Sequence, residues 1–342
     1  MANIDCNSEM KNFHSAEVTL SKGQQDEMRS RRDNGRTRLT NGLTLKGHPS
    51  YTDIHSQGSY QMRTMVQDDN SKYDIDDGVY FVEDSLADLS PLDARQRVCD
   101  ALVWDGRLKM NAEVKDNCVR QEYPAGYHID MPVYRIMLDK TDAGEAFSYF
   151  ELASGYEWVE SDARAVTKWF NGYVGELNKG AVDGSQLRRV TKLTKKLARS
   201  RDSWKSQTTS GIAITKLVVD HFVAAENRDD QSLRLTWQAI EAALNESTII
   251  EHPVLEDGNL ADENDAEVLF FRDTLNNALQ ELEVLDKTDC SRKSARTAWD
   301  EVFNIAYFSS QPDNEPQEKK AATLNITSND TSRRIDGGGR FG

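Results

Sequence analysis

The chain is 342 residues long and acidic, with 57 aspartate and glutamate residues against 42 lysine and arginine residues and a formal net charge of −15. This charge argues against tight binding of nucleic acid duplexes, because such binding depends on neutralising phosphates with cations. No apolar run approaches transmembrane length and no signal peptide opens the chain, so we expect a cytoplasmic protein without membrane contact. The four cysteines are widely spaced, which predicts neither a zinc site nor a disulfide framework.

The N-terminal half is predicted to combine helices and strands. Residues 1–19 are polar and are expected to be loosely held. A helix is predicted from Ser21 to about Leu45, with Ser21 as the N-cap and Gln24 at the capping-box position. Apolar residues at helical spacing predict a further helix at about 90–103. The predicted strands cover about 75–83, 116–122, 127–138 and 148–153.

From Ser161 onward the pattern is helical. Ser161 is expected to cap a helix whose aromatic stripe, which includes Phe170 and Tyr173, is predicted to be core. Further helices are predicted at about 185–201, 210–226, 230–246, 262–286 and 291–306. From about Ser309 the composition changes to small, polar and charged residues, which cannot bury a core and therefore predict disorder.

A Gly-Ser turn precedes the first predicted strand, within the segment Ser-Gln-Gly-Ser-Tyr at residues 56–60. Such a turn can hold a phosphate on its backbone N–H groups, because Gly58 allows close approach and Ser59 adds a hydroxyl. A lone Gly-Ser pair is usually only a turn, so the prediction depends on the acidic residues further along the chain.

Three aspartates come after the turn on predicted strands. Asp74 and Asp76 lie two residues apart and therefore point to the same side of a strand. His128 and Asp130 alternate in the same way around an apolar residue. His128 either supports Asp130 or has a purely structural role, and the sequence leaves both readings open.

Carboxylates in this arrangement suit divalent cations. Mg²⁺ prefers hard oxygen ligands and takes few protein carboxylates. Two cations roughly 3.5–4 Å apart can stabilise the attacking and leaving oxygens of a nucleotidyl transfer. The sequence therefore predicts a nucleoside triphosphate site with two Mg²⁺ or Mn²⁺ ions, in which Asp74, Asp76 and Asp130 are metal ligands and catalytic residues.

Taken in order, three strings resemble the cGAS/DncV-like nucleotidyltransferases, the bacterial cyclic-oligonucleotide synthases of antiphage defence, and among them the 3′,3′-cyclic GMP-AMP synthase branch. These strings are Gln-Gly-Ser-Tyr at 57–60, Asp-Ile-Asp-Asp-Gly at 74–78 and His-Ile-Asp-Met-Pro at 128–132. The resemblance covers about residues 20–308. It implies an α+β fold in which a polymerase-β-like core with an N-terminal spine helix, residues 20–158, packs on a helical domain, residues 159–308. Flexible segments at 1–19 and 309–342 would flank them.

The resemblance also implies roles for individual residues. Gln57, Gly58 and Ser59 would grip the nucleotide, and Arg120 would contact a base. Lys195 and Ser210 would bind the phosphates. For Lys195 a solvated helix face stays open as an alternative.

The implied reaction makes cyclic GMP-AMP or a related cyclic purine nucleotide from ATP and GTP with release of pyrophosphate. The product would be a second messenger that activates an effector in antiviral defence. A cyclic trinucleotide synthase, a transferase with a macromolecular acceptor and an idle scaffold are the alternatives. The tail ends in Gly342 and resembles tails that ubiquitin-type E1 and E2 ligases activate, so conjugation at Gly342 is a further hypothesis.

Overall fold

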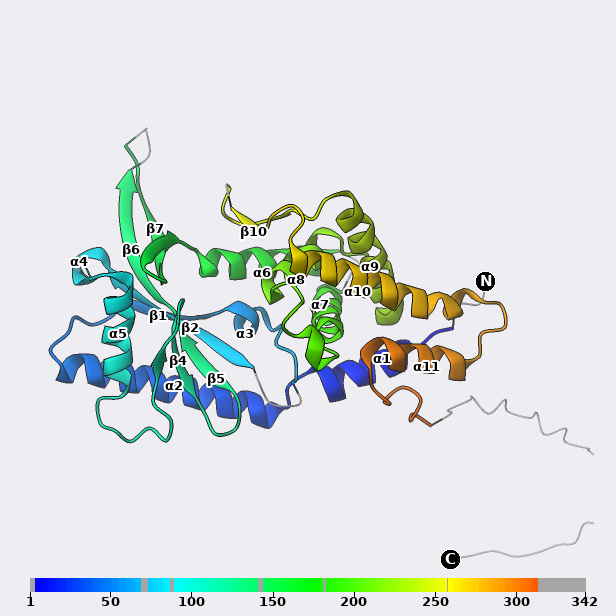
Figure 1. The fold of residues 1–342 in the computed structure, drawn as a ribbon, viewed down its shortest axis with the longest axis horizontal. Helices are drawn as coiled ribbons and strands as arrows, with labels where there is room; N and C mark the ends of the chain where they lie inside the picture. The colour runs from blue at the N-terminus through cyan, green and yellow to red at the C-terminus, as the bar shows by residue number, and fades with distance from the viewer. Residues whose placement is uncertain are drawn as a thin grey trace, which may run out of the picture. The chain divides into compact units, whose positions relative to one another are not determined.

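A mixed β-sheet fills the N-terminal half of the computed structural model, which describes residues 4–68, 73–86, 89–140, 144–180, 183–256 and 258–312 (Figure 1). Eight strands build it in this part of the chain. Its centre is β2 (Asp74–Val82), which pairs antiparallel with β1 (Asp53–Gln57) and parallel with β5 (His128–Met131) and β6 (Val133–Lys140). Some residues of β2 pair with β1 and also with β5 or β6. The strand β1 therefore lies on one edge of β2, and β5 and β6 lie on the other edge.

The strands β5 and β6 are one path interrupted at Pro132. Proline has no N–H to donate to a ladder, so a strand breaks there. The carbonyl of Pro132 still accepts the N–H of Val79 at 2.8 Å, which keeps the path beside β2. The sheet then extends outward through β4 (Val119–Glu122) and β3 (Glu113–Val114) beyond β5, and through β7 (Ala146–Ser154) and β8 (Glu157–Glu160) beyond β6.

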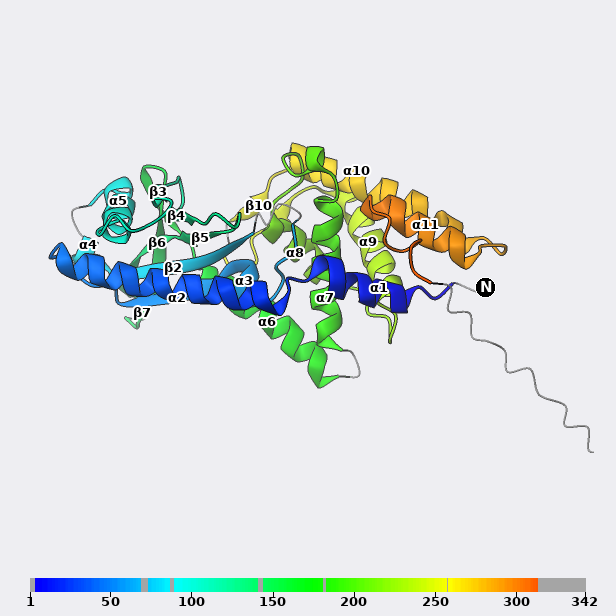
Figure 2. The same cartoon turned by 90° about the horizontal axis from the view of Figure 1, so that it is seen from below.

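One face of the sheet is covered by α2 (Lys22–Leu45) and α5 (Pro91–Leu102), as Figure 2 shows for α2. Ser21 caps α2 in a capping box with Gln24, as predicted. Gly42 of α2 lies against the backbone of α5, where a Cβ would come within 1.9 Å of the carbonyl oxygen of Ala101. The apolar residues packed in this layer include Leu39, Leu43, Ile75, Val79, Phe81, Ala94, Val98, Ile129 and Val133.

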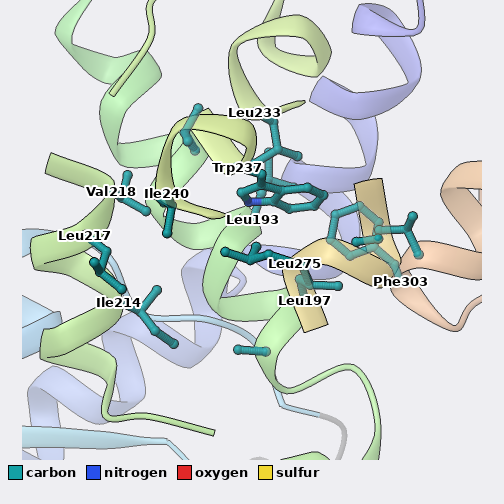
Figure 3. Packing of buried hydrophobic residues seen from close by; sticks show 14 of the residues in the cluster. Leu193, Leu197, Ile214, Leu217, Val218, Leu233, Trp237, Ile240, Leu275 and Phe303 are labelled. Atoms are coloured by element: carbon teal, nitrogen blue, oxygen red, sulfur yellow. The ribbon is translucent and has the colours of Figure 1, made fainter. Parts of the chain in front are cut away.

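The C-terminal half is a set of helices around a second core. Trp237 lies at its centre and donates its indole N–H to Thr194 Oγ1 at 2.9 Å (Figure 3). Leucine, isoleucine and aromatic side chains from several helices surround it, so these helices share one core. The helices are α6 (Ala163–Lys179), α7 (Gly184–Ala198), α8 (Gly211–Asp220), α9 (Asp229–Glu246), α10 (Ala266–Glu281) and α11 (Arg292–Phe303).

Several short elements complete the described fold. A five-residue helix, α3 (Gly58–Met62), follows β1 directly and contains the Gly-Ser turn. The remaining elements are α1 (Asn7–Phe13), a π-helical segment (His14–Val18), α4 (Glu83–Leu86), two 3₁₀ turns (Asp202–Trp204 and Leu282–Asp286), and the strands β9 (Ile250–Glu251) and β10 (Asn259–Ala261). No helix among the described residues has both the length and the apolar character needed to cross a bilayer.

The expectation of a loosely held N-terminus is wrong for residues 4–19. Cys6, Met10 and Phe13 are fully buried in the helical core, and Cys6 donates its N–H to Asp230 at 2.9 Å. The three residues recur at the spacing of one helix face. Polar residues on the exposed side of α1 concealed this stripe in the sequence.

Three further predictions about helices differ from the structure. Asp162, and not Ser161, caps α6, accepting the N–H of Ala165 at 2.8 Å. The aromatic stripe of α6 is only partly core, because Phe170 is buried whereas Tyr173 is 48 % exposed. The helix predicted at 210–226 ends at Asp220, in α8.

The predicted tail begins one residue after the last part of the described core. Phe308 is buried, and the carboxylate of Asp300 accepts the N–H groups of Phe308 and Ser309 at 2.7 and 2.9 Å. Residues 313–342 of the tail, including the predicted conjugation site Gly342, lie outside the described residues.

Candidate active site

A cavity of about 380 Å³ opens beside β2 on the face opposite α2. Elements from both halves of the fold form its walls, with α3 and β2 on one side and α6, α7 and α8 on the other. Its lining residues are Gly58, Ser59, Met62, Thr64, Met65, Val66, Tyr73, Asp74, Asp76, Ser161, Asp162, Ala163, Val166, Lys195, Arg199, Gly211, Ile212 and His252.

The parallel register of β2 and β5 brings the three predicted aspartates together. Asp74 lies opposite His128, and Asp76 lies opposite Asp130. Paired residues of neighbouring strands point to the same face of a sheet, so all four side chains share one face. Oxygen and nitrogen atoms of Asp74, His128 and Asp130 lie within 4.8 Å of one another. The structure therefore gathers acidic residues from two strands that are far apart in the sequence.

Repulsion and burial act on the middle of this cluster. Burial, and then the charges of Asp74 and Asp130, raise the pKa of Asp76 well above its usual value. A cation placed among these carboxylates would relieve the repulsion, and carboxylate oxygens are the ligands that Mg²⁺ accepts. The residues present therefore fit a divalent cation, which Asp74, Asp76 and Asp130 would hold.

Arg120 and His128 both contact Asp130. The guanidinium of Arg120 donates two hydrogen bonds to the Asp130 carboxylate, at 2.8 and 2.7 Å, and His128 Nε2 lies 3.5 Å from Asp130 Oδ2. Arg120 faces Asp130 across the antiparallel β4–β5 pair, and it does not line the cavity. In this structure Arg120 is a partner of a metal-ligand candidate, and contact with a base would require it to leave Asp130.

The Gly-Ser turn touches the acidic cluster. Gly58 has φ +61°, and a Cβ on it would lie 2.2 Å from Asp76 Oδ2. Both the backbone conformation and the close contact therefore require glycine at this position. Ser59 lines the cavity next to it.

The side chain of Gln57 does not line the cavity, where the predicted contact with a nucleotide would place it. Gln57 is 4 % exposed, donates through Nε2 to the hydroxyl of Tyr134 at 2.9 Å and accepts from the hydroxyl of Tyr80 at 3.1 Å. Both ends of its amide are thus engaged by a stacked tyrosine pair beneath the turn. Gln57 supports the turn from the protein interior.

Lys195 does not lie on a solvated helix face. It is 5 % exposed, lines the cavity and donates from Nζ to Thr64 Oγ1 at 3.3 Å. Burial, and then the charge of Arg199, lower the pKa of Lys195 to about 7, while Asp74 acts in the opposite direction. A phosphate in the cavity would supply the counter-charge that this buried amine lacks.

Ser210 caps the helix that begins beside the cavity. Its hydroxyl accepts the N–H of Ala213 at 3.2 Å and so caps α8, and it does not line the cavity. The next two residues along the chain, Gly211 and Ile212, do line it. The positive end of the α8 dipole therefore lies at the cavity beside Lys195, where it favours an anion.

The lining residues that were not predicted as site residues include Thr64, Tyr73, Asp162, Arg199 and His252. Asp162 had a detectable signal, since an acidic residue before an apolar helical stripe is a common N-cap. Arg199 and His252 carried none, because each reaches the cavity only through the packing of distant segments, whereas Thr64 and Tyr73 lie close in sequence to the predicted turn and aspartates.

Comparison with known proteins places this geometry in a family. Residues 52–134, which contain the Gly-Ser turn and all three aspartates, match the family described as Cyclic GMP-AMP synthase DncV-like, nucleotidyltransferase domain. Residues 52–134 are thus similar to a DncV-like nucleotidyltransferase domain. The predicted resemblance to the cGAS/DncV-like nucleotidyltransferases is thereby confirmed.

A curated relative is similar to a longer part of the chain. The cyclic GMP-AMP synthase of Escherichia albertii is 27% identical over 225 residues, which cover 62% of this chain and 46% of that protein. The match thus spans about half the length of the curated relative.

Solved DncV structures share the fold at low sequence identity. Vibrio cholerae DncV has a TM-score of 0.69 at 16% identity, covering 87% of this chain and 96% of that one. Escherichia coli DncV with 3′-deoxy GTP has a TM-score of 0.66 at 19% identity, again covering 87% and 96%. The predicted α+β fold, a nucleotidyltransferase core with a C-terminal helical part, is confirmed.

Proposed function

We propose that this nucleotidyltransferase-like protein joins purine nucleoside triphosphates into a cyclic dinucleotide, releasing one pyrophosphate for each phosphodiester bond. The observation that carries the proposal is the grouping of Asp74, Asp76 and Asp130 on one sheet face, against the Gly58 turn and across the cavity from Lys195. Acidic ligands on one wall and a buried amine on the other suit a substrate with a metal-bound triphosphate.

The carboxylates would bind the cations, and other residues of the cavity would bind the phosphates. Divalent cations held by Asp74, Asp76 and Asp130, two in number in our proposal, would offset phosphate charge and activate the reacting oxygens when bound. Ser59 would donate its hydroxyl to a phosphate oxygen, and the protonated Lys195 amine would neutralise a second one. Thr64 holds the Lys195 amine in place. Positioning and electrostatics then supply most of the rate, as in phosphoryl transfer generally.

The relatives support a choice of substrate and product. The curated relative is named cyclic GMP-AMP synthase, and Vibrio cholerae DncV, a cyclic AMP-GMP synthase, has been solved in complex with nonhydrolyzable GTP. We therefore take ATP and GTP as the substrates and cyclic GMP-AMP as the product. A role of the product as a second messenger that activates an effector in antiviral defence belongs to the same proposal.

Product analysis tests the proposal. The full chain is incubated with all four nucleoside triphosphates and Mg²⁺ or Mn²⁺, treated with phosphatase and analysed by mass spectrometry. We expect a phosphatase-resistant cyclic species that is absent with Asp74→Asn/Asp76→Asn and present with Asp116→Asn, an exposed carboxylate outside the cavity. Pyrophosphate release with only linear or macromolecule-linked products would instead favour a transferase with another acceptor.

A further inference from the structure

A second cavity, of about 710 Å³, lies behind α3. Gly58, Ser59 and Met62 of α3 line the first cavity, whereas Tyr60 and Gln61 line the second. The short helix and the residues just after it therefore separate the two. The lining of the second cavity consists of Thr19, Leu20, Gln25, Arg29, Tyr60, Gln61, Arg63, Met65, Asn171, Arg188 and Lys192.

The charge of this lining is opposite to that of the chain. It contains the four cations Arg29, Arg63, Arg188 and Lys192, and no aspartate or glutamate among the described residues that line it. The whole chain, by contrast, carries a formal net charge of −15. Because cations are the charged residues of this lining, the electrostatic potential in the cavity is positive although the chain as a whole is acidic.

Two of these cations are held by neutral groups. Arg188 donates from Nε to the carbonyl of Met62 at 3.2 Å and from Nη2 to Asn171 Oδ1 at 2.9 Å. Lys192, one turn further along α7, donates from Nζ to Thr19 Oγ1 at 3.1 Å. Their side chains are thus fixed at the cavity wall, and no carboxylate of the described residues forms an ion pair with either of them.

Burial without a counter-charge shows in the titration of both groups. Burial lowers the pKa of Lys192 to about 8. Burial, and then the charge of Arg63, lower the pKa of Arg188. Arg29 does have a carboxylate neighbour, Asp26, at 3.5 Å, but both of these side chains are about half exposed and Asp26 does not line the cavity. An anion in the cavity would recover the free energy that the unbalanced cations cost.

We propose that this second cavity binds a compact polyanion with two or more phosphate groups, either a free polyphosphate chain or the phosphate tail of a nucleotide. Guanidinium groups bind phosphate oxygens in pairs, and three of the four cations are arginines. The volume lies within the range of about 300–1,000 Å³ that small-molecule sites occupy. The proposal does not depend on what the first cavity synthesises.

Calorimetric titration of inorganic triphosphate into the full chain, with EDTA present, tests this site. EDTA removes the divalent cations with which the aspartates of the first cavity would hold a triphosphate, so we expect the binding to occur in the second cavity. We expect one saturable site per chain whose affinity falls as salt rises. Arg188→Gln and Lys192→Gln should each weaken binding at least tenfold.

Matched variants separate this site from general charge effects. Lys168→Gln, on an exposed part of α6, should bind triphosphate as the wild type does, and Lys195→Gln reports whether any of the binding occurs in the first cavity. Arg63→Gln changes an exposed side chain, so it tests the site even if an α7 variant fails to fold. Circular dichroism checks the fold of each variant.

The outcomes decide the proposal and the source of the phosphates. No binding to the wild type, equal affinity in the Arg63, Arg188 and Lys192 variants, or loss of binding in Lys195→Gln would overturn it. A second titration uses ATP with EDTA. An affinity for ATP at least equal to that for triphosphate assigns a nucleotide tail, and a lower affinity assigns a free polyphosphate chain.

Discussion

Asp76 and Asp77 are neighbours on β2 and point to opposite faces of the sheet. Asp77 is fully buried toward α2, where Arg36 donates from Nε at 2.7 Å and from Nη2 at 2.5 Å, and Ser56 donates its hydroxyl at 2.9 Å. Asp76 faces the first cavity, where its charged neighbours include Asp74 and Asp130. One carboxylate has a complete set of partners, whereas the other is surrounded by like charge.

The two neighbouring aspartates therefore have different roles. Asp77 stabilises the fold, whereas Asp76 belongs to the candidate cation site. The guanidinium and the hydroxyl satisfy Asp77, so its pair anchors α2 to the sheet without any ligand. The carboxylates around Asp76 repel one another, Arg120 offsets this repulsion only in part, and a bound cation would relieve it further. Asp77 and the apolar residues of the same face hold β2 in position while the opposite face carries that repulsion.

The largest effect should come from Asp76→Asn. We expect nucleotidyl transfer to fall at least a thousandfold, about 4 kcal/mol of activation free energy, because a cation ligand is lost. With EDTA present the variant should be at least as stable as the wild type, because the repulsion is relieved. Pyrophosphate release and thermal unfolding measure the two effects. Wild-type activity in this variant would refute the assignment of Asp76.

The adjacent change, Asp77→Asn, should act on stability. Removing one partner of a buried ion pair leaves the other unbalanced, and we expect a loss of about 3 kcal/mol in the free energy of unfolding. Urea denaturation followed by circular dichroism measures it. The variant protein that remains folded should keep its cation site, because Asp77 lies on the other face. A free energy of unfolding within about 1 kcal/mol of the wild-type value would show that the Asp77 ion pair contributes little to stability.

Gly58→Ala tests the contact between the turn and the cluster. Its Cβ would clash with Asp76 Oδ2, so we expect activity to fall about a hundredfold, roughly 2.7 kcal/mol. Gly47→Ala is the matched control, because Gly47 has a similar φ of +66° but nothing within 4 Å of its Cβ position. Both variants should lose similar stability from backbone strain, and only Gly58→Ala should lose activity. Equal activities would show that the contact with Asp76 is unimportant.

The smallest effect should be the pH dependence that Lys195 introduces. Its lowered pKa of about 7 means that the free protein carries the charged amine below pH 7 and loses it above. We therefore expect kcat/KM for the triphosphate to fall about tenfold per pH unit above pH 7. Lys195→Gln should lack this limb, and Lys168→Gln should keep it. An unchanged profile in Lys195→Gln would exclude Lys195 as its source.

The same shift makes a prediction for stability. The lysine titrates near 10.4 in the unfolded chain and at about 7 in the folded one. Between these values the unfolded chain binds more protons, so the contribution of Lys195 to stability rises with pH across this window. Comparing urea denaturation of the wild type and Lys195→Gln at pH 7 and pH 9 measures that contribution. The free energy of unfolding of the wild type minus that of Lys195→Gln should increase from pH 7 to pH 9, and a value that decreases or stays constant would contradict the lowered pKa.

Features encoded within a few residues could be predicted from the sequence. The capping box at Ser21, the helix predicted at about 90–103 and found at Pro91–Leu102, and the shared face of Asp74 and Asp76 all arise from local spacing. The family resemblance also came from local strings. Such features depend on backbone periodicity and on hydrogen bonds between near neighbours, which a short segment specifies by itself.

Features that join distant segments were decided by the tertiary structure. The sheet register placed Asp130 beside Asp76 and Arg120 on Asp130, and helix packing buried Lys195. The second cavity likewise collects cations from three separate places, namely α2, the residue after α3, and α7. The burial and charge around each side chain depend on which distant residues surround it, and the side chain's own sequence neighbourhood does not contain that information.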